Sequence, residues 1–457
     1  MKTSPFKAYD IRGRVGETLT TDLMRDVGQA FAGQVAQAGP VVVGFDARES
    51  SPVLAEAVIE GLGIGGSDVL ELGMCGTEEV YFATDHLGAS GGLMVTASHN
   101  PMGDNGLKLV AAGARPVGQD TGLGQIEALC RSGRQPSASR RGARHLVDAR
   151  PAYVARVLSF IDPAALAPLK VLVNAGNGAA GPTFDALAAA LNSAGAPVTF
   201  ERLHHDPDPT FPNGIPNPLL PENHPVTAKK VVDIGADIGV AWDGDFDRCF
   251  FFDADGCFVD GVYLVGLLAQ AALRRSPGDT IIYEPRAVFS TRDAVADAGG
   301  RAVMGRTGHS FMKASMRAEN AAYGGEISAH HYFRDFMYCD SGIIPMLLIL
   351  DEISRSGQSL SELVAARIAA YPVSGEQNFR LANPEAALQA VEARYATAAT
   401  HRDDTDGLSL EFADWRFNLR RSNTEPLVRL NVEARGDARR VTAETQAIAA
   451  LLNQAGA

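Results

Sequence analysis

Short apolar runs rich in valine and isoleucine alternate along the chain with segments whose apolar residues recur at helical spacing. The first set predicts a strand at 41–46, a helix at 51–62 and a second strand at 68–72. Strand, helix and strand in this order are typical of βαβ units with parallel strands. The same order recurs twice more, at 170–174, 183–191 and 197–200, and at 280–284, 290–298 and 301–304.

The spacing of these sets predicts the domain organisation. The sets open near residues 41, 170 and 280, too far apart for one continuous sheet, so we predict three domains of similar build. Residues 376–457 differ, with strand-like pieces near 415–419 and 428–432 flanked by two alanine-rich helical stretches. The predicted fold class is therefore α/β, with three similar βαβ-type mixed-sheet domains and a smaller C-terminal α+β domain. The predicted boundaries are 1–144, 145–253, 254–370 and 371–457.

Two segments without apolar periodicity are predicted to be surface connections. Residues 131–143 are rich in Arg, Ser, Gly and Pro, and residues 206–221 contain six prolines.

The composition and charge of the chain argue against several classes of function. The chain has 457 residues, of which 46% are hydrophobic and 21% charged, with a formal charge of −13. This charge argues against nucleic acid or an anionic membrane as the main partner. There is no stretch of signal-peptide or membrane-spanning length, and the five cysteines are scattered without a CxxC pair. We expect a cytoplasmic protein with reduced thiols.

The segment Asp243–Arg248 is the strongest chemical signal. Asp243, Asp245 and Asp247 alternate after the apolar run 238–242, and such carboxylates repel one another unless a cation lies between them. A divalent ion with a preference for oxygen ligands, such as Mg²⁺, satisfies this arrangement. A calcium-binding EF-hand loop fits poorly, because Arg248 stands where that loop requires glycine. The alternative interpretation is a solvated acidic turn, but ligands gather at the carboxyl ends of strands.

Ser98 lies in a second polar segment, 96–101, which also follows an apolar run, at 93–95. The GxSxG frame of a hydrolase nucleophile is absent, although His99 is adjacent. A phosphorylated Ser98 would carry nearly two negative charges and would need a metal to lie beside three aspartates. A turn or helix-capping serine is the competing interpretation.

Further polar segments offer groups for phosphate and sugar. Residues 420–424 combine guanidinium, hydroxyl and amide groups that suit a phosphate dianion, although a polar hairpin turn would look the same. Residues 325–330 offer a carboxylate, a hydroxyl and an imidazole, which suit sugar hydroxyls or a buried polar turn equally. Residues 9–13, Lys108 and 306–310 add cations and a further histidine.

Together these segments resemble the α-D-phosphohexomutase family, and within it bacterial phosphomannomutases, including those that also act as phosphoglucomutases. The resemblance covers nearly the whole chain. Six segments occur in the expected order: 9–13, 96–101, 243–248, 307–310, 325–330 and 420–424.

The resemblance implies four domains around a central cleft: a phosphoserine domain, a metal-binding domain, a sugar-recognition domain and a C-terminal phosphate-binding domain. It implies Mg²⁺ held by Ser98, Asp243, Asp245 and Asp247. It assigns catalytic roles to Ser98, His99, Lys108, Arg12, Arg248 and His309. It assigns substrate binding to Tyr9, Arg286, Gly308, Glu326, Ser328, His330, Arg420, Ser422, Asn423, Thr424 and Arg429.

The implied activity is the interconversion of mannose 6-phosphate and mannose 1-phosphate, and also of the glucose phosphates, through a phosphoserine and a 1,6-bisphosphate. Glucose or mannose 1,6-bisphosphate would act as activator. The implied enzyme is an isomerase of the intramolecular phosphotransferase type, a monomer that acts on hexose phosphates and supplies polysaccharide biosynthesis. The alternatives are a phosphoglucosamine mutase, a non-catalytic sugar-phosphate sensor, and a metal-dependent phosphatase.

Several positions depart from common spellings of the family. Phe246 stands where many relatives have glycine, so the metal loop must accommodate an aromatic ring. Ile327 and Ala329 replace a frequent methionine and glycine, and Arg286 stands where some relatives have lysine. The changes beside Glu326 leave the sugar preference open.

Overall fold

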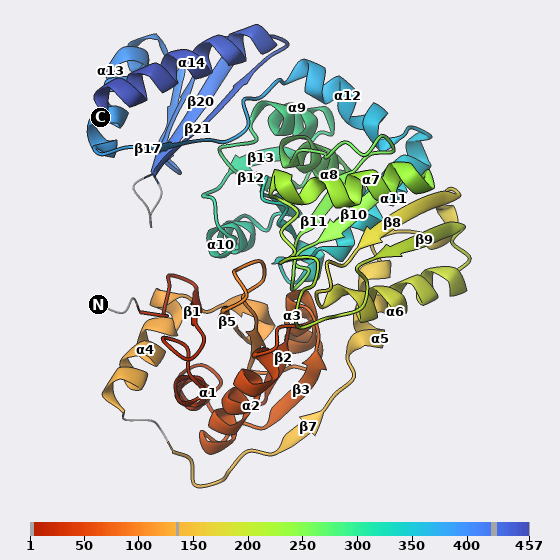
Figure 1. Cartoon of the computed structure of the whole chain (residues 1–457), viewed down its shortest axis with the longest axis vertical. Helices are drawn as coiled ribbons and strands as arrows, with labels where there is room; N and C mark the ends of the chain where they lie inside the picture. Colours follow the sequence, from red (N-terminus) through yellow and green to blue (C-terminus); the bar gives the residue numbers. More distant parts are fainter. Residues whose placement is uncertain (1–3, 134–136, 422–426, 457) are drawn as a thin grey trace. The chain divides into compact units, whose positions relative to one another are not determined.

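The computed structural model describes residues 4–133, 137–421 and 427–456 (Figure 1). The chain forms two compact units. Unit 1 comprises Met1–Val259 and Ser328–Leu360, and unit 2 comprises Asp260–Ile327 and Ser361–Ala457. Within the described ranges, every helix is too short or too polar to cross a membrane.

The first sheet of unit 1 is mixed, with strand order β1-β5-β4-β2-β3-β7, and β6 pairs with β5. The strands β4, β2, β3 and β7 are parallel neighbours, whereas β5 runs antiparallel to β4 and β1. The strands are β1 (Asp10–Arg14), β2 (Val41–Phe45), β3 (Val69–Met74), β4 (Gly91–Val95), β5 (Asp104–Ala111), β6 (Arg115–Pro116) and β7 (Arg144–Leu146).

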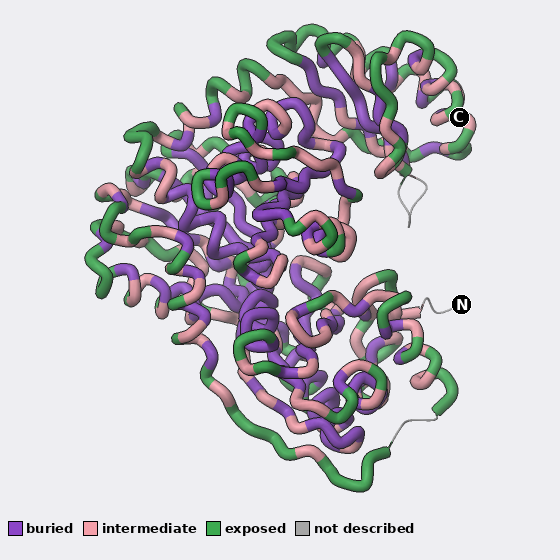
Figure 2. The backbone as a smooth tube through the Cα atoms, turned by 180° about the vertical axis from the view of Figure 1, so that it is seen from behind, coloured by how far each residue is buried: buried purple, intermediate pink, exposed green. Residues whose placement is uncertain are grey.

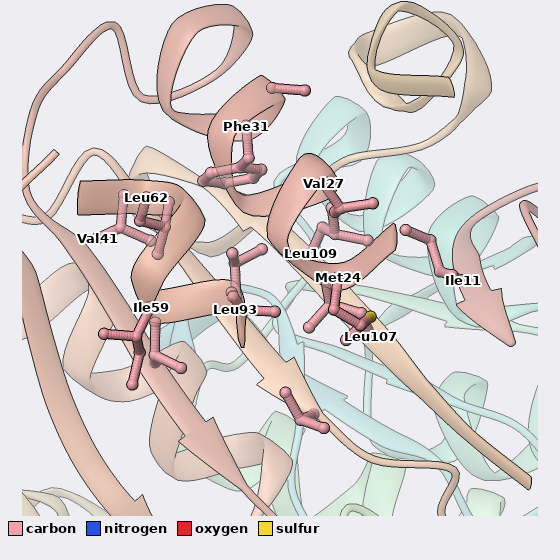
Figure 3. Close-up of a cluster of buried hydrophobic side chains, with 14 of the residues drawn as sticks. Ile11, Met24, Val27, Phe31, Val41, Ile59, Leu62, Leu93, Leu107 and Leu109 are labelled. Carbon is pink, nitrogen blue, oxygen red and sulfur yellow. The ribbon is translucent and has the colours of Figure 1, made fainter. Parts of the chain in front are cut away.

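Helices cover both faces of this sheet. Val27 and Phe31 of α1, together with Leu62 of α2, pack on Leu93 and Leu109 of the sheet (Figure 3). α3 packs on the opposite face. The central strand β4 is consequently buried at every position, whereas the edge strand β7 is exposed. Figure 2 colours the buried segments of the backbone purple and the exposed ones green. The helices are α1 (Thr21–Gln34), α2 (Ser51–Ile64), α3 (Thr77–His86) and α4 (Leu123–Ser132).

The second sheet of unit 1 has the order β11-β10-β8-β9. Phe184 of α6 lies against Phe200 and Trp242, whereas Val231 of α7 packs with Phe252 on the other face. The remaining elements of unit 1 include the antiparallel pair β15 and β16. The bounds are α5 (Arg150–Leu158), β8 (Leu169–Asn174), α6 (Ala180–Ser193), β9 (Val198–Leu203), α7 (His224–Ile234), β10 (Ile238–Trp242), β11 (Cys249–Phe252), β15 (His331–Phe333), β16 (Cys339–Asp340) and α11 (Ile343–Ser356).

Unit 2 contains the parallel strands β13-β12-β14 and an antiparallel sheet of order β17-β21-β20-β19-β18. The first group comprises α8 (Gly261–Arg275), β12 (Thr280–Tyr283), α9 (Phe289–Asp297), β13 (Arg301–Met304), α10 (His309–Glu319), β14 (Tyr323–Gly325) and α12 (Leu360–Ala370). The second comprises β17 (Gln377–Arg380), α13 (Pro384–Tyr395), β18 (His401–Asp403), β19 (Leu408–Glu411), β20 (Trp415–Arg421), β21 (Leu427–Ala434) and α14 (Ala438–Ala455).

The three predicted βαβ sets are confirmed, each within a few residues, and so is the fold class of three α/β parts with a C-terminal α+β part. One segment needs correction. The connection predicted at 131–143 begins later, because α4 continues to Ser132 before Gly133 ends it in a left-handed conformation. The proline-rich segment carries no helix or strand in the described residues 206–220, as predicted.

Candidate active site

The carboxyl ends of three parallel strands bring polar residues to one edge of the first sheet. β2 is followed by Asp46 and Arg48, β3 by Thr77, and β4 by Ser98. Parallel strands end at the same edge, which is where α/β proteins bind ligands.

Ser98 is held in a strained and enclosed position. Its φ is +49°, in the left-handed region that residues with a Cβ seldom adopt, and only 3% of its surface is exposed. The Ser98 amide donates to Thr96 Oγ1 at 2.8 Å, while Ser98 Oγ lies 2.5 Å from Asp243 Oδ2 and 3.0 Å from His99 Nδ1. The structure thus brings the predicted serine and the first predicted metal ligand into direct contact.

Asp243, Asp245 and Asp247 lie in the turn between the antiparallel strands β10 and β11, as the sequence predicts. All three are buried, and their ligand oxygens lie within 4.8 Å of one another. Oδ1 of Asp245 and Oδ1 of Asp247 are buried and lack a hydrogen-bond partner among the described residues. Because buried carboxylate oxygens without partners are costly, these atoms fit a divalent cation.

The electrostatics of the triad support the same interpretation. Burial and the neighbouring Asp245 carboxylate raise the pKa of Asp247 well above its usual range. Burial alone would raise the pKa of Asp245, but the Lys108 ammonium lowers it instead. The raised pKa of Asp247 shows that the surrounding cations do not fully offset the burial of the triad, and a divalent cation would favour its ionised form.

Cations surround Ser98 despite the acidic average of the chain. Arg248 donates to Asp243 Oδ2 from Nε at 3.0 Å and from Nη2 at 2.8 Å, and it also contacts His99 Nδ1. Lys108 Nζ lies 2.7 Å from Asp245 Oδ2 and also contacts Asp247. Arg12 donates to the Ala97 carbonyl oxygen at 3.3 Å and to Asn100 Oδ1 at 2.8 Å. The predicted catalytic residues of unit 1 therefore form one cluster.

His99 serves this cluster as a neutral ring. Burial and the Arg248 guanidinium lower the pKa of His99 to about 2. Its Nδ1 can therefore accept hydrogen bonds from neighbouring donors.

The segment 325–330 is divided between the two units. Ser328 Oγ lies 3.2 Å from His330 Nδ1, and His330 Nε2 lies 3.8 Å from Asp247 Oδ1, all within unit 1. Asp340 in β16 joins Asp247 and His330 in a group whose ligand atoms lie within 4.8 Å. Tyr9 immediately precedes β1, also in unit 1. The structure thus places Ser328 and His330 with the metal triad.

Unit 2 brings another group of predicted residues together. Glu326 Oε1 accepts from the Gly308 amide at 2.6 Å, and Gly308 has a φ of +120°, which explains the need for glycine before α10. His309 is the first residue of α10.

Two predicted arginines of unit 2 share a carboxylate. Arg286 donates to both oxygens of Glu284, and its Nη1 lies 3.1 Å from Glu376. Arg429 Nη1 lies 3.3 Å from the same Glu376.

Arg420 pairs with Asp406 at 3.3 Å. The predicted residues Ser422, Asn423 and Thr424 lie outside the described residues.

Comparisons with known proteins match all four parts of the chain. The matched families are phosphoglucomutase/phosphomannomutase alpha/beta/alpha domain I at residues 3–136, domain II at 151–256, domain III at 260–371 and the C-terminal domain at 376–451. The chain belongs to the phosphoglucomutase/phosphomannomutase family.

Individual relatives agree with this assignment. A Salmonella typhimurium protein named phosphomannomutase is 55% identical over 99% of this chain and 100% of its own length. A Xanthomonas campestris protein named phosphohexose mutases is 54% identical, with the same coverage. A solved phosphoglucomutase/phosphomannomutase family protein of Burkholderia thailandensis is 32% identical, with a TM-score of 0.86 over 97% of this chain and 96% of that one.

The ring of Phe246 has room because Gly76, the residue before α3, has no side chain. Phe246 is fully buried with a φ of +44°, and a Cβ on Gly76 would lie 2.2 Å from its ring. Next to Gly76, Thr77 Oγ1 lies 2.5 Å from Asp245 Oδ2, and the Thr77 amide donates to the Asp245 carbonyl oxygen. The aromatic ring therefore packs where α3 meets the metal loop.

Sequence reasoning missed Arg48, Thr77, Asp340 and Glu376. Arg48 and Thr77 each follow a parallel strand within three residues, the same signal that identified Ser98. Asp340 and Glu376 carry no such signal, because their partners are distant in sequence.

Proposed function

We propose that this chain is a phosphomannomutase that interconverts mannose 6-phosphate and mannose 1-phosphate, with the glucose phosphates as further substrates. It is an isomerase that passes a phosphoryl group through Ser98 and a hexose 1,6-bisphosphate. The observation that carries this proposal is the 2.5 Å contact between Ser98 Oγ and Asp243 Oδ2. It lies in a cluster with the buried residues Asp245, Asp247 and Arg248 and the half-buried Lys108.

The proposed metal is Mg²⁺, held by Asp243, Asp245, Asp247 and the phosphorylated Ser98. The three carboxylates and the two unpartnered Oδ1 atoms suit a small cation that prefers oxygen ligands. When bound, Mg²⁺ supplies positive charge that polarises the phosphoserine.

In the forward half-reaction, the bond between phosphorus and Ser98 Oγ breaks as a bond to the sugar oxygen forms. The proton that leaves the sugar hydroxyl as its oxygen attacks balances the proton that Ser98 Oγ gains as it leaves phosphorus. The resulting Ser98 hydroxyl donates to Asp243 Oδ2. The reverse half-reaction returns the other phosphate of the bisphosphate to Ser98, so each cycle restores the starting enzyme.

Lys108, Arg12 and Arg248 stabilise the transferring group electrostatically. Burial lowers the pKa of Lys108, but the Asp245 and Asp247 carboxylates raise it more, so Lys108 stays an ammonium ion. Positive groups on the equatorial oxygens of a phosphoryl group are the main source of catalysis in such transfers. His99 is a neutral neighbour of Ser98 and helps to orient Oγ.

Further residues are proposed to bind the rest of the substrate. Glu326 and Ser328 would read sugar hydroxyls. Tyr9, Gly308 and His330 would also bind substrate, and His309 would have a catalytic role. The second phosphate would be bound by Arg286, Arg420, Ser422, Asn423, Thr424 and Arg429. Arginines suit this role because their planar guanidinium can bind phosphate oxygens in pairs.

Further parts of the proposal concern the enzyme as a whole. We propose glucose or mannose 1,6-bisphosphate as activator, a monomeric state, a cytoplasmic location, and domain boundaries at 144/145, 253/254 and 370/371. A phosphoglucosamine mutase or a sensor without activity is less well supported. Relatives from Salmonella typhimurium and Escherichia coli, at 55% and 51% identity, are named phosphomannomutase, and the triad, Lys108 and Ser98 are all present.

Rates with purified protein test the proposal. With Mg²⁺ and mannose 1,6-bisphosphate present, we expect kcat/KM for mannose 1-phosphate to exceed that for glucosamine 1-phosphate by more than about tenfold. A preference for the amino sugar would contradict the assignment. Inorganic phosphate released as fast as mannose 6-phosphate would instead indicate a phosphatase.

A further inference from the structure

The side chain of Arg48 donates hydrogen bonds to the loop that carries Ser98. Arg48 Nη2 donates to the carbonyl oxygens of Ser98 at 2.8 Å and Asn100 at 2.6 Å. Nη1 donates to the carbonyl oxygens of Pro101 at 3.0 Å and Asp104 at 3.1 Å. One guanidinium therefore binds four main-chain oxygens of residues 98–104.

We propose that Arg48 is a positioning residue whose planar guanidinium fixes the Ser98 loop in the conformation that presents Oγ to the metal triad. This inference rests on the proposed function, because it assumes that Ser98 carries the phosphoryl group. Arg48 does not itself touch the reacting atoms.

The direction of Ser98 follows from these contacts. A carbonyl oxygen bound to a fixed donor fixes its peptide plane, since the peptide unit is planar. The Ser98 carbonyl points to Arg48, while Ser98 Oγ points to Asp243 at 2.5 Å. A residue with a Cβ is strained at a φ of +49°, so the surrounding contacts must maintain this conformation.

The metal loop leaves the Ser98 carbonyl little freedom on its other side. A Cβ on Gly244 would lie 2.6 Å from the Ser98 carbonyl oxygen, so the two loops pack backbone to backbone. A small shift of the Ser98 peptide would therefore displace Oγ relative to Asp243, its neighbour at 2.5 Å.

Arg48 is itself fixed from several sides. Its amide donates to Asp46 Oδ1 at 3.0 Å, its Nε lies 3.6 Å from Asp46 Oδ2, and Asp46 also accepts from Ser51 Oγ at 2.5 Å. The ring of Phe211, from the proline-rich segment 206–221, lies 5.9 Å from the guanidinium carbon. Only 3% of the Arg48 surface is exposed.

Because Arg48 is paired with Asp46, the effect of its donor geometry can be distinguished from the effect of its charge. Because the buried carboxylate neutralises the guanidinium, Arg48 offers little net attraction to a phosphate. Its contribution therefore lies in the forked arrangement of its donors, which lysine cannot reproduce. Arg48→Lys keeps the charge and removes the fork, so it is the informative substitution.

Steady-state kinetics of Arg48→Lys test the proposal, with Val58→Ala as a control. Val58 is a fully buried residue of α2 in the same core and contributes no contact to the Ser98 loop among those described. Binding of mannose 1-phosphate is measured separately by calorimetry in the Ser98→Ala background, where transfer cannot occur.

We expect kcat of Arg48→Lys to fall about 10- to 100-fold, since displacements near 1 Å at a reacting centre cost rates of this order. The Kd for mannose 1-phosphate should change by less than about twofold. Val58→Ala should lose thermal stability but keep kcat within about twofold. A kcat of Arg48→Lys within about twofold of wild type would overturn the inference, as would loss of substrate affinity equal to the loss of kcat.

Two further outcomes are informative. If Arg48→Lys does not fold, Arg48→Gln takes its place, and failure of both while Val58→Ala folds would contradict a positioning role and indicate a folding role. The proposed function fails separately, through an active Ser98→Ala enzyme or an inactive wild type.

Discussion

Two residues of the site, Ser98 and Phe246, adopt a left-handed backbone conformation despite their side chains. Each such residue costs about 1–3 kcal/mol and persists only where its surroundings impose it. Arg48 imposes the conformation at Ser98, and Gly76 leaves room for the ring of Phe246. Both residues lie in loops that meet at the contact between Ser98 and Asp243.

The contact between Gly76 and Phe246 gives the first prediction. Gly76→Ala places a methyl group about 2 Å from the ring, so we expect a loss of about 1–3 kcal/mol in unfolding free energy. Mn²⁺ affinity, measured by electron paramagnetic resonance, should also weaken, because the ring belongs to the metal loop. In the double variant with Phe246→Gly, the loss of stability should be smaller than the sum of the two single losses, with a coupling of at least about 0.5 kcal/mol.

Gly63→Ala is the matched control for that prediction. Gly63 lies in α2, and the nearest atom to an added Cβ is 3.6 Å away. Gly63→Ala should therefore leave Mn²⁺ affinity unchanged. Strict additivity of Gly76→Ala and Phe246→Gly would contradict the packing argument.

At the scale of elements, the N-termini of helices organise the site. α3 begins at Thr77, which binds Asp245, and its next residue, Glu78, accepts from the amide of Gly342, the residue before α11. Glu78 is fully buried, and burial raises its pKa well above the usual range. The folded protein therefore keeps Glu78 protonated at pH values where the unfolded chain has lost the proton.

Glu78→Gln should stabilise the protein increasingly as pH rises. Above the unfolded pKa of about 4.3, folding of the wild type must take up a proton, which costs up to about 1.4 kcal/mol per pH unit until the raised pKa is reached. Glutamine does not titrate, so the difference in unfolding free energy should be larger at about pH 8 than at about pH 5. Urea unfolding at both pH values measures it, and a difference independent of pH would show that Glu78 is ionised in the fold.

The pattern of apolar residues predicted the helices and strands better than it predicted the contacts between side chains and loops. The valine-rich runs 41–46 and 170–174 became buried parallel strands because both the period and the composition suit them. The strand-end position of Ser98 and Asp243 identified the centre of the site. The binding of Arg48 to four carbonyl oxygens could not be predicted, since it depends on how a loop fifty residues away folds back. The need for glycine at position 76 likewise becomes clear only from the Phe246 ring that packs against it.

At the scale of the molecule, unit 2 contains a buried network of charged groups. In unit 2, Arg416 lies buried against Glu433 at 2.7 Å and donates to the Pro285 carbonyl oxygen. Glu433 also accepts from the amides of Val288 and Phe289 at the start of α9. This network joins the C-terminal sheet to the preceding α/β part within unit 2.

Arg416→Met should destabilise unit 2 strongly, because it leaves Glu433 buried without its cation. We expect a loss of about 3–5 kcal/mol in urea unfolding. Arg301→Met removes an exposed pair with Glu319 in the same unit and should cost at most about 1 kcal/mol. Equal losses for the two variants would contradict the importance assigned to the buried pair.

The central claim is that Ser98 carries the phosphoryl group through each cycle. The most direct measurement is intact-mass analysis with peptide mapping of dephosphorylated enzyme after addition of mannose 1,6-bisphosphate, followed by a chase with mannose 1-phosphate. We expect one phosphate on Ser98, its removal by the chase, and neither event nor isomerisation in Ser98→Ala. Isomerisation by Ser98→Ala at the wild-type rate, or phosphate on another residue, would contradict it.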